Sequence, residues 1–293
     1  MKGTDPGGDF RRLAVIGVGL IGGSFALAAR QRGLVGSVVA CARSPETLAV
    51  ALDRGIADEV THDPAEAVAE ADLVYVAAPV RATETLFSAM APALRPEALV
   101  TDAGSTKAAV VALADRYLAQ RCVFVGGHPM AGSDLAGPAA ARADLFQHKT
   151  YILTPTADTP VAALARMRDI VTAIDGVAVL AEPEQHDRLV AATSHLPHLV
   201  AAALCGALGD LAARTGDIRP FTGAGLRDAT RIAKGPPEVW RDILLDNRDN
   251  LKTALRLFSD EILHYIEAME AQDAEGLEGL LDKARGFRRS LDP

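Results

Sequence analysis

The chain has 293 residues, 49% of them hydrophobic and 23% charged, with a formal net charge of −8 at pH 7. This length and composition can bury one large core or two smaller ones, and the negative charge argues against nucleic acid as a partner. The sequence has no apolar leader and no uninterrupted apolar run near the roughly 20 residues of a membrane helix. Its three cysteines match no metal-binding spacing and are predicted to be reduced core residues: Cys41, Cys122 and Cys205. We therefore expect a cytoplasmic protein.

Short runs rich in apolar residues alternate with amphipathic stretches as far as about residue 181. This alternation is typical of a parallel β-sheet covered by helices. The expected strands are residues 13–16, 38–42, 73–77, 99–101, 122–125, 151–154 and 177–180. The first nine residues, rich in glycine and aspartate, are expected to be a disordered tail.

The first expected strand runs into a glycine-rich turn over residues 17–22, and a helix-forming stretch follows. Strand, G-x-G-x-x-G and helix in this order indicate a dinucleotide site. Gly17 permits the tight turn, Gly19 lets backbone amides approach the pyrophosphate, and Gly22 lets the helix pack on the strand. The helix N-terminus then binds the anion. We predict a Rossmann-type dinucleotide-binding domain over residues 10–181, with these cofactor-binding residues: Gly17, Gly19, Leu20, Ile21 and Gly22.

The end of the second expected strand bears on which dinucleotide binds. NAD sites usually carry an acidic residue there, which accepts the ribose 2′-hydroxyl. This chain has Arg43 and Ser44 instead, which could hold the 2′-phosphate of NADP. We therefore favour NADP over NAD. In the alternative interpretation Arg43 is a solvated loop residue, and Glu46 or another group serves NAD.

From residue 182 to residue 293 the strand signals disappear, and Leu, Ala and Val recur at helical spacing. We predict that this half is all-helical. Residues 244–263 are expected to form one long helix with an apolar face. Because such faces often pair with a second copy of the chain, we expect a homodimer.

Four further segments carry polar side chains suited to chemistry, at residues 102–107, 128–133, 194–198 and 228–234. His128 follows a strand in a glycine-rich turn, where an imidazole could accept a proton near neutral pH. Considered alone, His128 could instead be a turn residue bonded to backbone. His195 and His198 have a spacing that can bind metal, but no acidic or cysteine ligands accompany them, so we predict no metal site. Of that pair, His195 is interpreted as structural.

In this order the four segments resemble those of the prephenate and arogenate dehydrogenases, the cyclohexadienyl dehydrogenase family of tyrosine biosynthesis. The resemblance covers nearly the whole chain, from about Arg11 to the C-terminal helices. It implies a nucleotide-binding first domain and a helical second domain that dimerises. It also implies oxidative decarboxylation of prephenate to 4-hydroxyphenylpyruvate, with hydride transfer to NAD(P). The alternatives are an arogenate dehydrogenase, which gives tyrosine directly, and an enzyme that uses both substrates.

The resemblance also implies roles for single residues. His128 is the general base at the substrate hydroxyl, and Ser105 orients the same hydroxyl or the nicotinamide amide. Arg231 binds a substrate carboxylate, which in the family is the ring carboxylate. Other residues expected to meet the substrate are Ser194, His198, His186 and Asp134. Many prephenate-preferring members carry a glutamate near the last of these positions, so the shorter Asp134 leaves the choice between prephenate and arogenate open.

Two other classes of protein share part of this pattern. A different NADP enzyme of the same architecture, such as a hydroxyacid dehydrogenase, would keep the glycine motif and the helices. A non-catalytic nucleotide sensor would keep the glycines without a base and a carboxylate clamp. Since Ser105, His128 and Arg231 are all present, both alternatives rank below the dehydrogenase of the resembling family.

Overall fold

The computed structural model describes residues 10–133 and 135–291, so the expected tail over residues 1–9 lies outside the described residues. The first part of the chain forms an eight-stranded sheet in the order β3-β2-β1-β4-β5-β6-β7-β8. Its first six positions follow the strand order of a Rossmann domain. The strands are β1 (Phe10–Ile16), β2 (Val35–Cys41), β3 (Glu59–Thr61), β4 (Leu73–Val76), β5 (Leu99–Asp102), β6 (Val123–Pro129), β7 (Thr150–Thr154) and β8 (Val177–Leu180).

All seven predicted strands are present, and the sheet contains one strand that the sequence did not predict, β3. This strand has only three residues, Glu-Val-Thr, so it offers no apolar run to detect. The prediction of a parallel sheet is correct for β1 to β6 and wrong for β7, which pairs antiparallel with β6 and parallel with β8. The described residues between β6 and β7 include only a short 3₁₀ turn, η2 (Pro138–Ala140), whereas a parallel connection usually needs a crossover helix.

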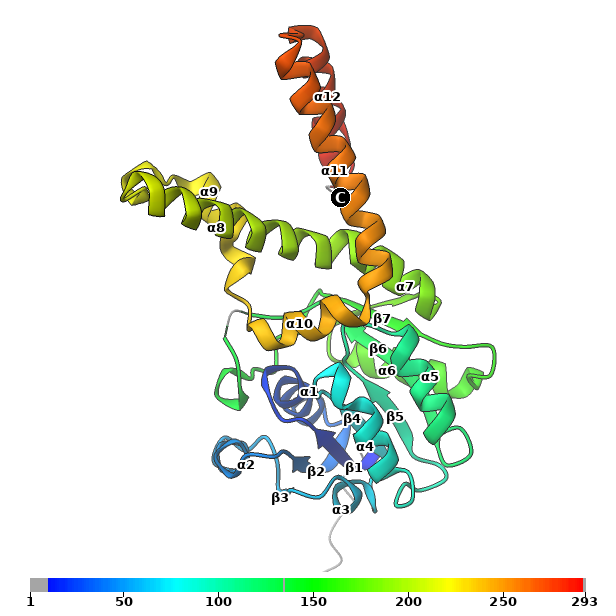
Figure 1. Cartoon of the computed structure of the whole chain (residues 1–293). Coiled ribbons are helices and arrows are strands. Elements are labelled where there is room, and N and C mark those ends of the chain that lie inside the picture. The colour runs from blue at the N-terminus through cyan, green and yellow to red at the C-terminus, as the bar shows by residue number, and fades with distance from the viewer. Residues whose placement is uncertain (1–9, 134, 292–293) are drawn as a thin grey trace, which may run out of the picture.

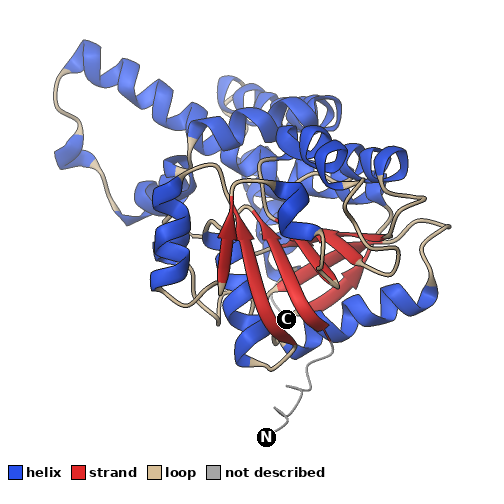
Figure 2. Ribbon diagram, turned by 90° about the horizontal axis from the view of Figure 1, so that it is seen from below, coloured by secondary structure: helices blue, strands red, loops and turns tan. Residues whose placement is uncertain are grey.

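Helices cover both faces of the sheet (Figure 2). Along β1, Leu13 and Val15 pack into one hydrophobic cluster, whereas Ala14 and Ile16 pack into the other. The first cluster includes side chains of α1 (Leu20–Gln31), α2 (Pro45–Asp53) and α6 (Val161–Ala173). The second includes side chains of α3 (Pro64–Val68), α4 (Thr83–Met90) and α5 (Ala108–Tyr117). Burial on both faces explains why β1, β4 and β5 read as continuous apolar runs.

The second part of the chain is helical, as predicted. Its helices are α7 (Pro183–Val190), the π-helical turn η3 (Ala191–His195), α8 (Leu196–Thr215), α9 (Ala224–Thr230), α10 (Pro237–Asp246), α11 (Arg248–Glu270) and α12 (Ala274–Ser290). Figure 1 shows α8 and the α11–α12 pair projecting away from the sheet, while α10 lies across its upper edge. The prediction of one helix over residues 244–263 is wrong, because the chain leaves the helical conformation at Asn247 (φ −105°, ψ 25°).

Large apolar side chains are exposed on these projecting helices in the single chain, among them Leu211, Leu257 and Phe287. Cys205 is exposed on α8, so its prediction as a core residue is wrong, whereas Cys41 and Cys122 are buried. Helical periodicity identified the apolar face of α8 but not what covers it. By length and composition alone, one stretch of the described helices, Pro183–Thr215, is apolar enough to cross a membrane, which the search for uninterrupted apolar runs did not anticipate.

Candidate active site

The glycine motif forms the turn that its sequence predicts. Gly17 has φ +95°, and a Cβ there would lie 2.5 Å from the carbonyl oxygen of Ala77. A Cβ on Gly22 would lie 2.1 Å from the carbonyl oxygen of Gly17, so neither position accepts a side chain without movement. Around Gly19, by contrast, a Cβ would meet no described atom within 4 Å.

The start of α1 is open to an anion. The helix begins at Leu20, and its N-cap residue, Gly19, has no side chain to bond the first amides. The backbone N–H groups of Leu20 and Ile21 are therefore left for a ligand at the positive end of the helix dipole. The space in front of Gly19 and the uncapped helix together fit the pyrophosphate of a dinucleotide.

At the end of β2, the two residues expected to select NADP differ in their surroundings. Arg43 is exposed, whereas Ser44 is half-buried and caps α2. The Ser44 hydroxyl accepts a hydrogen bond from the Thr47 amide at 3.2 Å and donates one to the Glu46 carboxylate. Helix capping is thus a role of Ser44 that the sequence analysis missed.

His128 lies at the carboxyl end of β6 and is only 7% exposed. Since β1, β4, β5 and β6 are parallel neighbours, their carboxyl ends meet at one edge of the sheet, which also carries Gly17 and Asp102. Ligands of open α/β sheets bind at this edge. The predicted histidine and the predicted cofactor turn therefore share one side of the domain.

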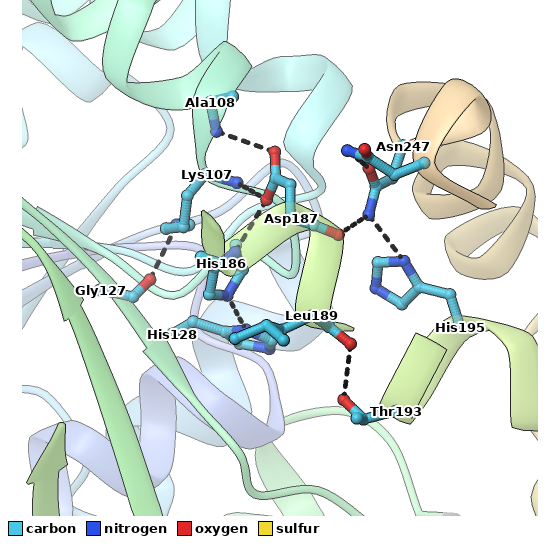
Figure 3. A network of polar contacts seen from close by, with 12 residues as sticks. Lys107, Ala108, Gly127, His128, His186, Asp187, Leu189, Thr193, His195 and Asn247 are labelled. Carbon is cyan, nitrogen blue, oxygen red and sulfur yellow. Dashed lines mark hydrogen bonds and ion pairs between the residues drawn. The ribbon is translucent and has the colours of Figure 1, made fainter. Parts of the chain in front are cut away.

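A chain of hydrogen bonds joins His128 to the helical half of the protein (Figure 3). His128 Nδ1 lies 2.8 Å from His186 Nε2, and His186 Nδ1 lies 2.8 Å from Asp187 Oδ1. The Asp187 carboxylate also accepts the backbone N–H groups of Lys107 at 2.7 Å and of Ala108 at 3.0 Å. These contacts fix α7 against the start of α5.

The carboxylate at the end of this chain determines where the protons lie. Asp187 only accepts, so His186 donates through Nδ1, and neutral His186 then accepts through Nε2. His128 must therefore donate through Nδ1, which leaves its Nε2 with a free lone pair. Among the described residues, Nε2 of His128 has no hydrogen-bonding partner. The arrangement can accept a proton from a ligand at this atom.

The electrostatic surroundings support a neutral imidazole and an ionised carboxylate. Burial, together with the neighbouring His186 ring and the Lys107 ammonium, lowers the pKa of His128 well below its usual 6.5. Burial alone would raise the pKa of Asp187, but the hydrogen bonds from His186 and the two amides outweigh it and keep this pKa below its usual value. At neutral pH, His128 is thus a base ready to accept a proton.

Two more histidines line the helical side of the network. Asn247 Nδ2 donates to the carbonyl oxygen of Asp187 at 2.7 Å and lies 3.2 Å from His195 Nδ1. Burial lowers the pKa of His195 to about 4, and these contacts suit the structural role predicted for it. The His198 ring stacks on Trp240 with centroids 3.4 Å apart. Within residues 10–133 and 135–291, no three His, Cys, Asp or Glu side chains form a metal-binding group.

The structure brings some predicted site residues together and leaves others apart. His128 and His186 are in direct contact, and His198 follows η3 on the same helical segment. Ser105 is half-buried in the turn after β5, and Ser194 is half-buried on η3. Arg231 is exposed on η5 (Arg231–Lys234) and is not part of the described network. Asp134 lies outside the described residues.

Three residues of the network were not assigned roles from the sequence: Lys107, Asp187 and Asn247. Asp187 directly follows His186, so an acid beside a candidate histidine was the available signal. Lys107 ends a segment that the sequence analysis had singled out. Asn247 offered no comparable signal, because its role depends on the break between α10 and α11.

Comparison with known proteins decides the family. The model of the prephenate dehydrogenase nucleotide-binding domain matches residues 25–180, and the model of the prephenate dehydrogenase dimerization domain matches residues 182–283. The chain belongs to the prephenate dehydrogenase family. Among curated members, the prephenate dehydrogenase of Bacillus subtilis is 36% identical over 95% of this chain and 76% of its own length. The cyclohexadienyl dehydrogenase of Zymomonas mobilis is 37% identical over 92% of each chain.

Solved structures of family members have the same architecture. The prephenate dehydrogenase of Aquifex aeolicus, in complex with hydroxyphenyl propionate and NAD+, superimposes with a TM-score of 0.91 at 34% identity, covering 96% of this chain and 98% of that one. The Synechocystis arogenate dehydrogenase superimposes with a TM-score of 0.80 at 30% identity, covering 96% and 99%. The predictions of the family, of an oxidoreductase, and of a Rossmann domain followed by a helical domain are confirmed.

Proposed function

We propose that this enzyme catalyses the oxidative decarboxylation of prephenate to 4-hydroxyphenylpyruvate, with hydride transfer to NAD(P). The observation that carries the proposal is the free Nε2 of His128, whose ring is oriented by His186 and Asp187 at the sheet edge that also bears the glycine turn. Arogenate, or both substrates, remains the alternative. That choice depends on the side-chain end of the substrate, where Asp134 is the proposed discriminating residue.

In the proposed reaction, His128 Nε2 accepts the proton of the substrate hydroxyl while hydride leaves the carbon that bears it. The bond from the ring to its carboxylate then breaks, its electron pair enters the ring, and carbon dioxide departs. Aromatisation makes the step effectively irreversible, and the imidazolium can return its proton to the new phenol oxygen. The bound dinucleotide supplies the hydride acceptor. The imidazolium, which burial disfavours, is stabilised through His186 by the ionised Asp187.

Further residues and properties belong to the same proposal. Arg231 binds the ring carboxylate, and Ser105 orients the hydroxyl or the nicotinamide amide. Ser194, His186 and His198 complete the helical wall of the substrate site. Residues 10–181 and 182–293 form the two domains. A homodimer through the helical domain accounts for the exposed apolar side chains of α8, α11 and α12, including the membrane-length stretch Pro183–Thr215. The three free cysteines suit the reducing cytoplasm.

Reduction of the nicotinamide, followed by absorbance, tests the proposed function in a two-by-two design. Prephenate and arogenate are each combined with NAD and with NADP. The expected result is activity with prephenate, and the most active combination identifies both the substrate and the cofactor. No activity in all four combinations, with dinucleotide binding intact, would contradict the proposed reaction.

Replacement of Arg231 by alanine is expected to raise KM for the substrate about ten- to hundred-fold, because hydrogen bonds to a charged group contribute about 1.5–3 kcal/mol. Turnover should change less, since the ring carboxylate loses its charge as carbon dioxide forms and the contact therefore contributes mainly to substrate binding. Steady-state kinetics measures both constants. Arg227→Ala, an exposed arginine on the preceding helix α9, is the matched control. An unchanged KM in Arg231→Ala would place the carboxylate elsewhere.

The cofactor preference is proposed to lean to NADP through Arg43. Loss of its guanidinium in Arg43→Ala is expected to raise KM for NADP by about tenfold or more, while KM for NAD stays nearly constant. NAD serves as the internal control, because it differs from NADP only in the 2′-phosphate. Equal changes in KM for the two dinucleotides would favour NAD as the cofactor and would mean that Arg43 is a solvated residue.

A further inference from the structure

Lys107 is the most deeply buried cation among the described residues. Its side chain is fully buried, and that of Asp102, its ion-pair partner, is 3% exposed. Lysine is rarely enclosed in this way, because removal of an ammonium group from water is costly. The reaction proposed above uses neither residue. Both lie beside its base, so their position calls for an explanation.

The pair holds the strand segment just before His128. The Lys107 ammonium donates to the carbonyl oxygen of Gly127 at 2.8 Å, while Asp102 Oδ1 accepts the backbone N–H of the same Gly127 at 3.0 Å. One ion pair thus binds both backbone polar groups of Gly127. The other carboxylate oxygen of Asp102 accepts the Gly104 N–H at 2.8 Å, which ties the turn after β5 into the same cluster.

Lys107 also reaches the opposite end of the hydrogen-bond chain. Its backbone N–H donates to Asp187 Oδ1 at 2.7 Å, and this oxygen accepts from His186 as well. One residue therefore contacts the neighbour of His128 through its side chain and the orienting carboxylate through its backbone. Figure 3 shows Lys107 between Gly127 and Asp187.

Gly127, which this ion pair holds, has no room for a side chain. A Cβ on Gly127 would lie 2.7 Å from the carbonyl oxygen of Asp102 and 3.0 Å from both Thr101 Oγ1 and a ring carbon of Tyr151. A side chain at this position would therefore displace its neighbours. Because Gly127 directly precedes His128, we expect a change in the Lys107–Asp102 ion pair to shift the position of His128.

We propose that Lys107 is a positioning residue whose ion pair with Asp102 holds the backbone of Gly127 and thereby fixes the location of His128. This inference rests on the proposed role of His128 and extends it to a residue that does not touch the substrate. Residues 102–107 would then have two roles: Ser105 contacts the ligand, and the Lys107–Asp102 ion pair positions His128.

The charged and titratable groups around His128 determine the direction of the expected pH effect. They are His186 and Asp187 on α7, His195 on η3, Asp102 at the end of β5, and Lys107 in the turn that follows β5. Lys107 contributes to the lowering of the His128 pKa. The base form of His128 therefore persists below pH 6.5 in the wild type, and removal of the cation is expected to move the acid limb of kcat to higher pH.

The test compares Lys107→Met with the double variant Lys107→Met/Asp102→Asn, in the full-length protein. The double variant removes both charges together, so it avoids an unpaired buried carboxylate that could prevent folding. In both variants we expect kcat to fall roughly hundred-fold, as for a catalytic group displaced by about 1 Å. The acid limb should shift upward in Lys107→Met, which loses the cation alone, and less in the double variant, which also loses the opposing charge of Asp102. The Kd of the dinucleotide should stay within about twofold of the wild type in both.

The matched control is Arg12→Met. Arg12 forms a paired ion bridge with Glu59, at 2.8 and 2.7 Å, near the amino ends of β1 and β3 and away from His128. This variant should keep both kcat and its pH profile. A purely structural role for Lys107 predicts a lower melting temperature with an unmoved acid limb. That result, or a kcat within about twofold of the wild type in the folded double variant, would overturn the inference. Absence of wild-type activity would instead contradict the proposed function.

Discussion

The His128→Asn variant is expected to lose about 10²- to 10⁴-fold in kcat, the usual contribution of a general base. Asparagine can still donate from its side-chain amide toward His186 Nε2, so the rest of the hydrogen-bond chain should survive. It offers no atom that takes up a proton near neutral pH. The loss should therefore fall on turnover, while the Kd of the dinucleotide, set by residues 17–22, stays nearly unchanged.

Single-turnover hydride transfer and dinucleotide titration separate these two effects. His148→Asn is the matched control, because His148 is exposed and has φ 58°, a backbone conformation that asparagine adopts readily. That control should retain wild-type kinetics. If His128→Asn also turned over at a near-normal rate, another group would be the base, and the free lone pair at Nε2 would have a different purpose.

The fold could be predicted where apolar residues and glycines alone determine it. The runs around β1, β4 and β5 are buried on both faces, and a strand of that kind has an unambiguous pattern. The direction of β7 could not be predicted, because apolar content does not show at which end of the sheet the connection from β6 leads the chain back into it. The break at Asn247 was equally hidden. Its conformation depends on hydrogen bonds with Asp187 and His195, which are more than 50 residues away in the chain.

In the candidate site, too, some residues could be predicted from the sequence and others could not. His128, His186 and the glycines could be predicted as site residues because motifs place them at fixed offsets, and the structure brings the two histidines into contact. Asp187 and Lys107 act through contacts between segments that are about 80 residues apart, α7 and the turn before α5. Sequence spacing carries no information on such a contact. The positions of the protons on His128 and His186 could be derived only from the structure, which shows Asp187 at the end of the hydrogen-bond chain.

That derivation makes Asp187→Asn the sharpest test of the site. An asparagine amide has one acceptor oxygen, whereas the carboxylate accepts three hydrogen bonds, from Lys107, Ala108 and His186. Oδ1 of Asp187 accepts from both Lys107 and His186, whereas Oδ2 accepts from Ala108. If the amide oxygen of the asparagine takes the Oδ2 position, its NH₂ group takes the Oδ1 position and donates to His186 Nδ1, while the Lys107 N–H loses its acceptor. His186 then carries its proton on Nε2 and donates to His128 Nδ1, which forces the proton of His128 onto Nε2. The lone pair that accepts the substrate proton is lost, although every residue other than Asp187 is unchanged.

The same exchange in a serine protease triad lowers kcat by about 10⁴. Because two histidines separate Asp187 from the substrate here, we expect a fall of roughly 10²- to 10³-fold, with dinucleotide affinity preserved. Asp273→Asn at the N-cap of α12 is the control, since asparagine caps helices as well as aspartate does. Nitrogen-15 NMR of labelled imidazoles reads the tautomers directly. A His128 Nε2 that stays unprotonated in Asp187→Asn, with kcat within about twofold of the wild type, would show that His128 does not depend on Asp187 for its proton-accepting form.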